Sequence, residues 1–135
     1  MLEGNDRFVV DASFLAEAIE HVNDPCYAKL FADETTVYAP RLIYCEIGNV
    51  LLWKEKKGII ELERISSVRS FLSTLRLHES DFLEIYDLAK RTGLTFYDAS
   101  YLQSAIDLKL PLATYDKQLR TAAEICRIKL LPVHQ

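Results

Sequence analysis

Short strand-like runs that alternate with amphipathic segments constrain the fold of this chain more than any other feature. The runs that suit strands cover residues 7–11, 36–39, 76–79, 112–115 and 128–131. The segments with a helical period cover residues 13–22, 25–31, 41–57, 61–75, 80–92, 97–110 and 117–126. Alternation of this kind is typical of βα units around a parallel sheet. We therefore predict an α/β fold with a central, mostly parallel sheet of four or five strands and helices on both faces.

Capping residues mark several of the predicted helix ends. Ser80 suits the N-cap of helix 80–92, and Gly58 and Gly93 suit left-handed positions after helices 41–57 and 80–92. Lys54, Lys56 and Lys57 give helix 41–57 a basic end. A solvated surface that complements the helix dipole is the simplest interpretation of these lysines, and contact with phosphate is the alternative.

Composition narrows the class of protein. A chain of 135 residues that is 50% hydrophobic suits one compact domain over residues 1–135. Its formal charge of −4 comes from 16 basic and 20 acidic residues, so no basic excess indicates nucleic-acid binding, although a metal or a local basic patch can still recruit phosphate. No apolar run approaches a membrane span, and residues 1–7 are polar rather than signal-like. We expect a soluble, cytoplasmic protein.

Cysteine and histidine usage argues against zinc and disulfides. Three cysteines (Cys26, Cys45 and Cys126) are odd in number and widely spaced, which favours a reducing compartment. Three histidines (His21, His78 and His134) lack the spacing of a zinc site.

Four acidic residues stand where a folded domain would place apolar or capping residues. Asp11 closes the run at residues 8–10, Asp98 opens a helix-like segment and Asp116 follows the run at residues 112–115. Each of these three could simply cap a helix. Glu46 lies within the apolar stripe of helix 41–57, where a buried carboxylate is costly unless it is paired, and the same helix face offers it no cation. A glutamate that reaches solvent from the edge of the stripe is the structural alternative.

Taken together, the four acids predict a site for a divalent cation. Asp11 and Asp116 follow strand-like runs, and ligands bind beyond the carboxyl ends of the strands in open parallel sheets. Oxygen ligands of this kind suit Mg²⁺. We expect Asp11 and Asp98 to be its principal ligands, and we expect Glu46 and Asp116 to bind it directly, through water or through a second ion. Ser13 and Thr114 could orient these groups, or could be ordinary capping and strand hydroxyls.

Four segments resemble the PIN-domain family. They contain Asp11 with Ser13, Glu46 with Asn49, Asp98 within Tyr97–Leu102, and Thr114 with Asp116. The similarity runs from about residue 8 to residue 131 and is greatest to the VapC-type toxins of toxin–antitoxin pairs. Lys109 and Arg127 stand where many relatives carry glycine in turns.

The resemblance implies a three-layer α/β/α nuclease fold and an endoribonuclease that depends on Mg²⁺ or Mn²⁺. Its acidic quartet would be Asp11, Glu46, Asp98 and Asp116, supported by Ser13, Asn49 and Thr114. It also implies an RNA substrate, a homodimer and a cognate antitoxin. The alternatives are a non-catalytic PIN-like module that binds RNA or protein, an RNA-processing nuclease without an antitoxin, and a DNA-directed nuclease.

Overall fold

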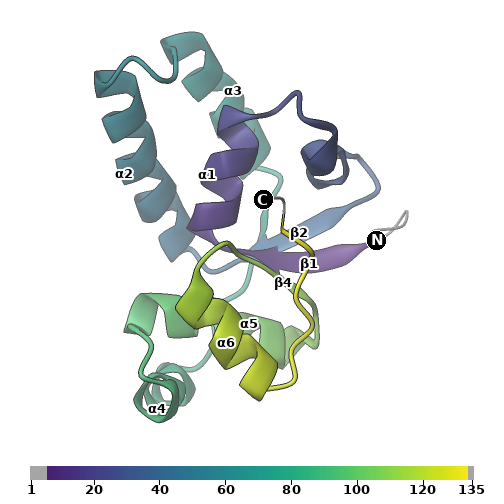
Figure 1. Ribbon diagram of the computed structural model, residues 1–135, viewed down its shortest axis with the longest axis vertical. Helices are drawn as coiled ribbons and strands as arrows, with labels where there is room; N and C mark the ends of the chain where they lie inside the picture. Colours follow the sequence, from purple (N-terminus) through teal and green to yellow (C-terminus); the bar gives the residue numbers. More distant parts are fainter. Residues whose placement is uncertain (1–5, 134–135) are drawn as a thin grey trace.

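The computed structural model describes residues 6–133, so residues 1–5 and 134–135, including His134, lie outside the described residues. The elements follow the predicted alternation of strands and helices (Figure 1). In chain order they are β1 (Arg7–Val10), α1 (Ala12–Glu20), the 3₁₀ helix η1 (Pro25–Phe31), β2 (Thr36–Ala39), α2 (Leu42–Lys56), α3 (Leu62–Leu72), β3 (Arg76–Leu77), α4 (Phe82–Thr92), α5 (Phe96–Leu108), β4 (Leu112–Ala113) and α6 (Lys117–Ile125).

The sheet has four strands in the order β3-β2-β1-β4, and every neighbouring pair is parallel. This arrangement confirms the predicted α/β class. Residues 128–131 were predicted as a closing strand, but within the described chain they form only an isolated bridge between Leu130 and Leu112. The ladder does not continue beyond this bridge, because the next backbone carbonyls, those of Thr114 and Leu131, accept instead from Nη1 of Arg120 at 2.9 and 3.4 Å.

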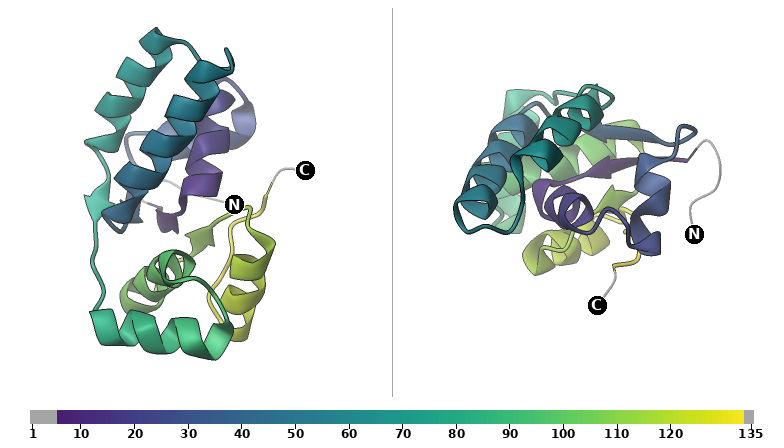
Figure 2. Two further views of the ribbon diagram at one scale, coloured as in Figure 1. Left: turned by 90° about the vertical axis from the view of Figure 1, so that its left-hand side faces the viewer. Right: turned by 90° about the horizontal axis from the view of Figure 1, so that it is seen from above.

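Helices cover both faces of the sheet. Figure 1 shows α1, α2 and α3 on one side of the strands and α4, α5 and α6 on the other. The left view of Figure 2 shows the same two groups above and below the strands. This division follows from right-handed crossovers, since the chain moves from β1 to β3 in one direction and then crosses back to β4. Strand order therefore reverses between β1 and β4.

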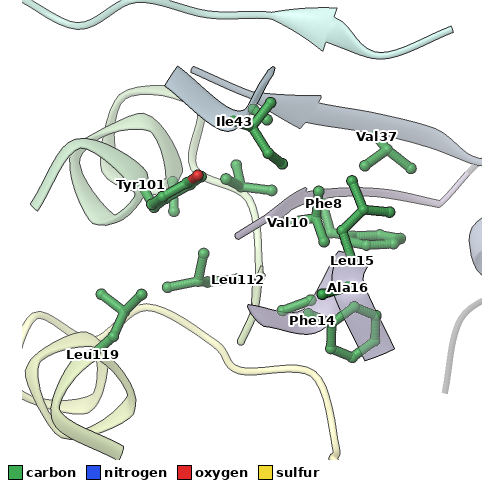
Figure 3. Close-up of a cluster of buried hydrophobic side chains, with 14 of the residues drawn as sticks. Phe8, Val10, Phe14, Leu15, Ala16, Val37, Ile43, Tyr101, Leu112 and Leu119 are labelled. Carbon is green, nitrogen blue, oxygen red and sulfur yellow. The ribbon is translucent and has the colours of Figure 1, made fainter. Parts of the chain in front are cut away.

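The core lies between these layers. The central strand β1 is buried on both faces through Phe8, Val9 and Val10, as a parallel strand between two helical layers must be. Figure 3 shows Phe8 and Val10 close to side chains from both helical groups, with Leu15 on one side and Tyr101 on the other. Among the described residues, no helix has the length and apolar character needed to cross a bilayer.

Local signals fixed most of the helix ends. Gly58 and Gly93 have φ values of +75° and +77°, which confirms the predicted left-handed positions. Lys109 and Arg127 are also left-handed, with φ values of 58° and 61°, so both occupy turns that favour glycine. The predicted cap of α4 was wrong: Asp81, rather than Ser80, accepts hydrogen bonds from the backbone N–H groups of Leu83 and Glu84.

Candidate active site

The site begins where β1 ends. Asp11 follows Val10 and caps α1, so its backbone continues a buried strand while its side chain meets the amides of a new helix. Its N–H also donates to the carbonyl of Ala113 on β4. Asp11 therefore lies at the carboxyl ends of β1 and β4, where the strand order reverses and ligands of open parallel sheets bind.

The carboxylate of Asp11 is buried and held by three donors. Oδ1 accepts from Ser13 Oγ at 2.8 Å and from the N–H of Phe14 at 2.9 Å. Oδ2 accepts from Thr114 Oγ1 at 2.5 Å. Only 4% of Asp11 is exposed, and burial raises its pKa to about 6 despite these three hydrogen bonds, with a further rise from the charge of Asp98. The carboxylate is thus fixed in place, but no basic side chain among residues 6–133 forms an ion pair with it.

Ser13 and Thr114 link Asp11 to the start of α6. Ser13 Oγ accepts from the N–H of Tyr115, and Thr114 Oγ1 accepts from the N–H of Asp116. Asp116 in turn caps α6, with Oδ1 accepting from the N–H of Leu119 at 2.8 Å. Two of the acids therefore cap helices, as the structural alternative predicted. Both caps share Thr114 as a hydrogen-bond partner, so Asp11 and Asp116 can cap helices and still belong to one site.

Asp98 and Glu46 come from helices on opposite faces of the sheet. Thr95 rather than Asp98 caps α5, which places Asp98 in the first turn with its N–H donating to Thr95 Oγ1. Glu46 lies on α2 and is partly buried, and its Oε1 accepts from the hydroxyl of Tyr101 on α5 at 2.5 Å. The partner of Glu46 lies on a different helix, so the residue pattern of α2 alone does not reveal it.

The acids act on one another electrostatically. Burial raises the pKa of Asp98 above its ordinary value, and the negative charges of Asp116 and Glu46 raise it further. The charge of Asp98 in turn contributes to the raised pKa of Asp11. None of the ion pairs among the described residues involves any of these four acids.

This donor set fits a hard divalent cation. Carboxylates and hydroxyls are oxygen ligands of the kind that Mg²⁺ and Mn²⁺ prefer, and a nearby cation lowers the cost of a buried carboxylate. The ligand atoms of the quartet are more widely spread than those of another group on α1. Among the described residues, Glu17, Glu20 and His21 bring their ligand atoms within 4.8 Å of one another.

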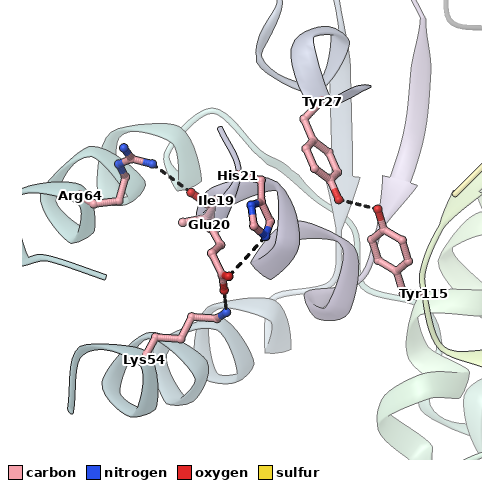
Figure 4. A network of polar contacts seen from close by, with 7 residues as sticks. All are labelled: Ile19, Glu20, His21, Tyr27, Lys54, Arg64 and Tyr115. Atoms are coloured by element: carbon pink, nitrogen blue, oxygen red, sulfur yellow. Dashed lines mark hydrogen bonds and ion pairs between the residues drawn. The ribbon is translucent and has the colours of Figure 1, made fainter. Parts of the chain in front are cut away.

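One member of that second group, Glu20, already has a cation within the chain. Figure 4 shows Glu20 between His21 and Lys54, which reaches it from α2. The interpretation of Lys54 as part of a solvated surface was wrong, since its side chain is only 11% exposed and is paired with Glu20. The close spacing of its ligand atoms makes this group resemble a metal site, but the ion pair between Glu20 and Lys54 indicates a structural role.

The supporting residues differ in how closely they join the site. Ser13 and Thr114 bond to Asp11 directly. Asn49 is exposed on α2, and among the described residues no side-chain hydrogen bond joins it to the acids. Tyr101 was missed, although it lies three residues after Asp98 and so on the same helix face.

Known proteins resemble this chain over most of its length. The PIN domain model matches residues 8–125. Exonuclease VapC9 from Pyrobaculum aerophilum is 34% identical over 116 residues, which cover 84% of this chain and 83% of the relative. Ribonuclease VapC1 from Mycobacterium tuberculosis is 30% identical over 131 residues, which cover 93% and 98%.

A solved structure agrees with the sequence relatives. The crystal structure of PAE2754 from Pyrobaculum aerophilum superposes with a TM-score of 0.65 at 28% identity. The match covers 87% of this chain and 86% of that protein. Together with the family match and the two relatives, it leads to one conclusion: the chain belongs to the PIN-domain family and is of the VapC type.

Proposed function

We propose that this protein is a ribonuclease that depends on Mg²⁺ or Mn²⁺ and cleaves RNA internally. The observation that carries the proposal is the convergence of four acids that no ion pair among the described residues involves. Asp98 experiences the charges of Glu46 and Asp116, and Asp11 experiences that of Asp98. The relatives named exonuclease and ribonuclease support nuclease chemistry. The name exonuclease denotes cleavage from a chain end by that relative, whereas the name ribonuclease does not distinguish internal from terminal cleavage.

Each acid has a role that follows from its surroundings. Asp11 and Asp98 would be the principal ligands of the cation, because their pKa values are raised by burial and by neighbouring charge. Glu46 and Asp116 would bind it directly, through water or through a second ion. Ser13 and Thr114 hold Asp11 in one orientation, and Asn49 offers an exposed amide to the RNA backbone. When bound, the cation would activate water and stabilise negative charge on the phosphate.

A circular single-stranded RNA tests metal dependence and internal cleavage together. We expect Mg²⁺ or Mn²⁺ to give a linear product, and we expect neither a chelator nor the Asp98→Asn variant to do so. Asp87→Asn is the matched control, since Asp87 is an exposed acid on α4 that pairs with Arg91. Cleavage by Asp98→Asn at the parental rate would disprove the site, and degradation of linear RNA alone would indicate an exonuclease. A circular DNA cut equally well would indicate a DNA-directed nuclease.

The VapC type leads us to extend the proposal to a toxin that acts on cytoplasmic RNA, as a homodimer and with a cognate antitoxin. Exposed aromatic side chains on α4 and α5 support an interface: the ring of Phe82 lies 5.2 Å from that of Phe96 and 6.2 Å from that of Tyr86. Light scattering measures the mass in solution. Induced expression should arrest growth, and co-expression of the protein encoded by the adjacent gene should restore it. Growth unaffected by the parental protein would contradict the toxin role.

A further inference from the structure

Tyr101 connects the two helical layers near the carboxyl ends of the strands. It belongs to α5, it is only 1% exposed, and its hydroxyl donates to Oε1 of Glu46 on α2. Figure 3 shows its ring among the buried side chains, with the oxygen turned toward the side on which Ile43 of α2 lies. A buried hydroxyl requires a partner, and this one finds it in a carboxylate from the opposite layer.

The surroundings of this hydroxyl are those of the candidate site rather than of the general core. Tyr101 lies one helical turn after Asp98, so both side chains leave α5 on the same face. The charges of Glu46, Asp11 and Asp98 all act on the Tyr101 side chain. Tyr101 is therefore a neutral hydrogen-bond donor placed among three of the four acids.

A glutamate ligand needs such a donor more than an aspartate does. Glu46 has one more rotatable bond than the three aspartates, so holding its carboxylate in one orientation costs more side-chain entropy. Asp11 is fixed by Ser13, Phe14 and Thr114, and Asp116 is fixed by the first turn of α6. For Glu46 the comparable constraint is the short hydrogen bond from Tyr101.

We propose that Tyr101 is a positioning residue for cation binding: its hydroxyl holds Oε1 of Glu46 and leaves Oε2 to serve as the ligand. This inference rests on the proposed function, because it assigns Tyr101 to the same cation site. Partners that orient a metal ligand in this way preorganise the site before the metal binds. A purely structural role would require only that the ring fill the core and that the hydroxyl be satisfied.

Mn²⁺ binding to the Tyr101→Phe variant separates these roles, because the variant keeps the ring and removes only the hydroxyl. By calorimetry, we expect the Mn²⁺ dissociation constant to rise about 10- to 100-fold, the range found when such orienting partners are removed. At a fixed, subsaturating Mn²⁺ concentration, kcat should fall while KM for RNA stays unchanged. Thermal unfolding measured with a chelator checks that the variant is folded.

Tyr27→Phe is the matched control. Tyr27 is 5% exposed, and its hydroxyl pairs with that of Tyr115 at 2.5 Å (Figure 4), so this variant also loses one hydrogen bond of a buried tyrosine. Its Mn²⁺ affinity should equal that of the parental protein. Equal losses in the two variants would mean that any missing hydroxyl weakens binding through the fold, and this result would overturn the inference.

A double-mutant cycle tests whether Tyr101 acts through Glu46. Glu46→Gln should weaken Mn²⁺ binding, and adding Tyr101→Phe to it should cause no further loss, because the residue that Tyr101 positions is already impaired. Additive losses, or a folded Tyr101→Phe variant with parental affinity, would overturn the inference while leaving the proposed function intact. If the parental protein neither binds Mn²⁺ nor cuts RNA, the proposed function fails, and the role of Tyr101 fails with it.

Discussion

The acidic residues at the two ends of α1 differ in how their negative charge is compensated. At its C-terminal end Glu20 is paired with Lys54 and His21, so the chain supplies the positive charge itself. At its N-terminal end Asp11 receives hydrogen bonds from Ser13 and Thr114, but among the described residues it has no ion pair. Hydrogen bonds orient a carboxylate, whereas only a cation balances its charge.

This difference shows why spacing alone does not identify a metal site. The ligand atoms of Glu17, Glu20 and His21 lie closer together than those of the acidic quartet. Lys54, however, already forms an ion pair with Glu20. The quartet is more open, and burial and mutual charge raise the pKa values of Asp11 and Asp98. An acid cluster that its own fold leaves uncompensated is the better candidate for binding an external cation.

Asp11→Asn should have the largest effect, on RNA cleavage. Because the cation contributes several kcal/mol of charge stabilisation, losing a principal ligand should lower the rate by about 100- to 1,000-fold. Single-turnover cleavage of labelled RNA measures this loss. Glu17→Gln, an equivalent neutralisation in the other group, should cut RNA at the parental rate, and equal losses in the two variants would remove the distinction between the groups.

The stability of the metal-free protein should depend on the charge of Asp11. Below pH 3.8 this residue is protonated in the folded and unfolded chains alike; between pH 3.8 and its folded pKa of about 6, mainly the unfolded chain has lost the proton. Ionisation thus favours unfolding, and the contribution of Asp11 to stability should decline by about 3 kcal/mol across this window and stay level above it.

Comparison with Asp11→Asn isolates this contribution, because the other titrating groups are common to both proteins. Urea unfolding with a chelator should show the parental protein losing stability relative to the variant between pH 4 and pH 6. Saturating Mn²⁺ should reverse the difference at neutral pH by binding only the folded parental site. Parallel stability curves would mean that Asp11 carries no uncompensated charge.

Glu20→Gln should lower the stability of the fold, whereas Asp11→Asn should raise that of the metal-free protein. The reason is that Glu20→Gln removes the partner of a largely buried lysine. The side chain of Lys54 is 11% exposed, so leaving its ammonium group without a carboxylate should destabilise the fold by about 2 kcal/mol. Urea unfolding at pH 7 measures the change, and RNA cleavage should persist under conditions in which the variant is folded. Unchanged stability would show that solvent already screens this pair.

His21→Gln should have the smallest effect. The His21 side chain is 51% exposed and Glu20 keeps Lys54, so the expected loss is about 0.5 kcal/mol or less. The same urea titration detects it. A loss as large as that of Glu20→Gln would make His21, rather than Lys54, the principal partner of this acid.

Local patterns were enough to predict the element order and the end of the sheet at which the site lies. Apolar runs followed by aspartate gave β1 with Asp11 and β4 with Asp116, and the positions of Gly58 and Gly93 gave two helix ends. The expected strand at residues 128–131 failed because pairing depends on a neighbour and not on the run itself. Likewise, the interpretation of Lys54 failed because a helix end is solvated only if no other helix covers it.

By itself, the sequence determined what depends on neighbours along the chain: the βα alternation, the left-handed turns, and the acids that follow strands or begin helices. Tertiary structure decided which distant side chains meet. The hydroxyl of Thr114 reaches Asp11, that of Tyr101 reaches Glu46, and the ammonium group of Lys54 reaches Glu20, across 103, 55 and 34 positions of the chain. Such contacts depend on strand register and on how helices pack across the sheet, and no local periodicity encodes either. For that reason the acids could be named from the sequence, whereas the partner that orients Glu46 could not.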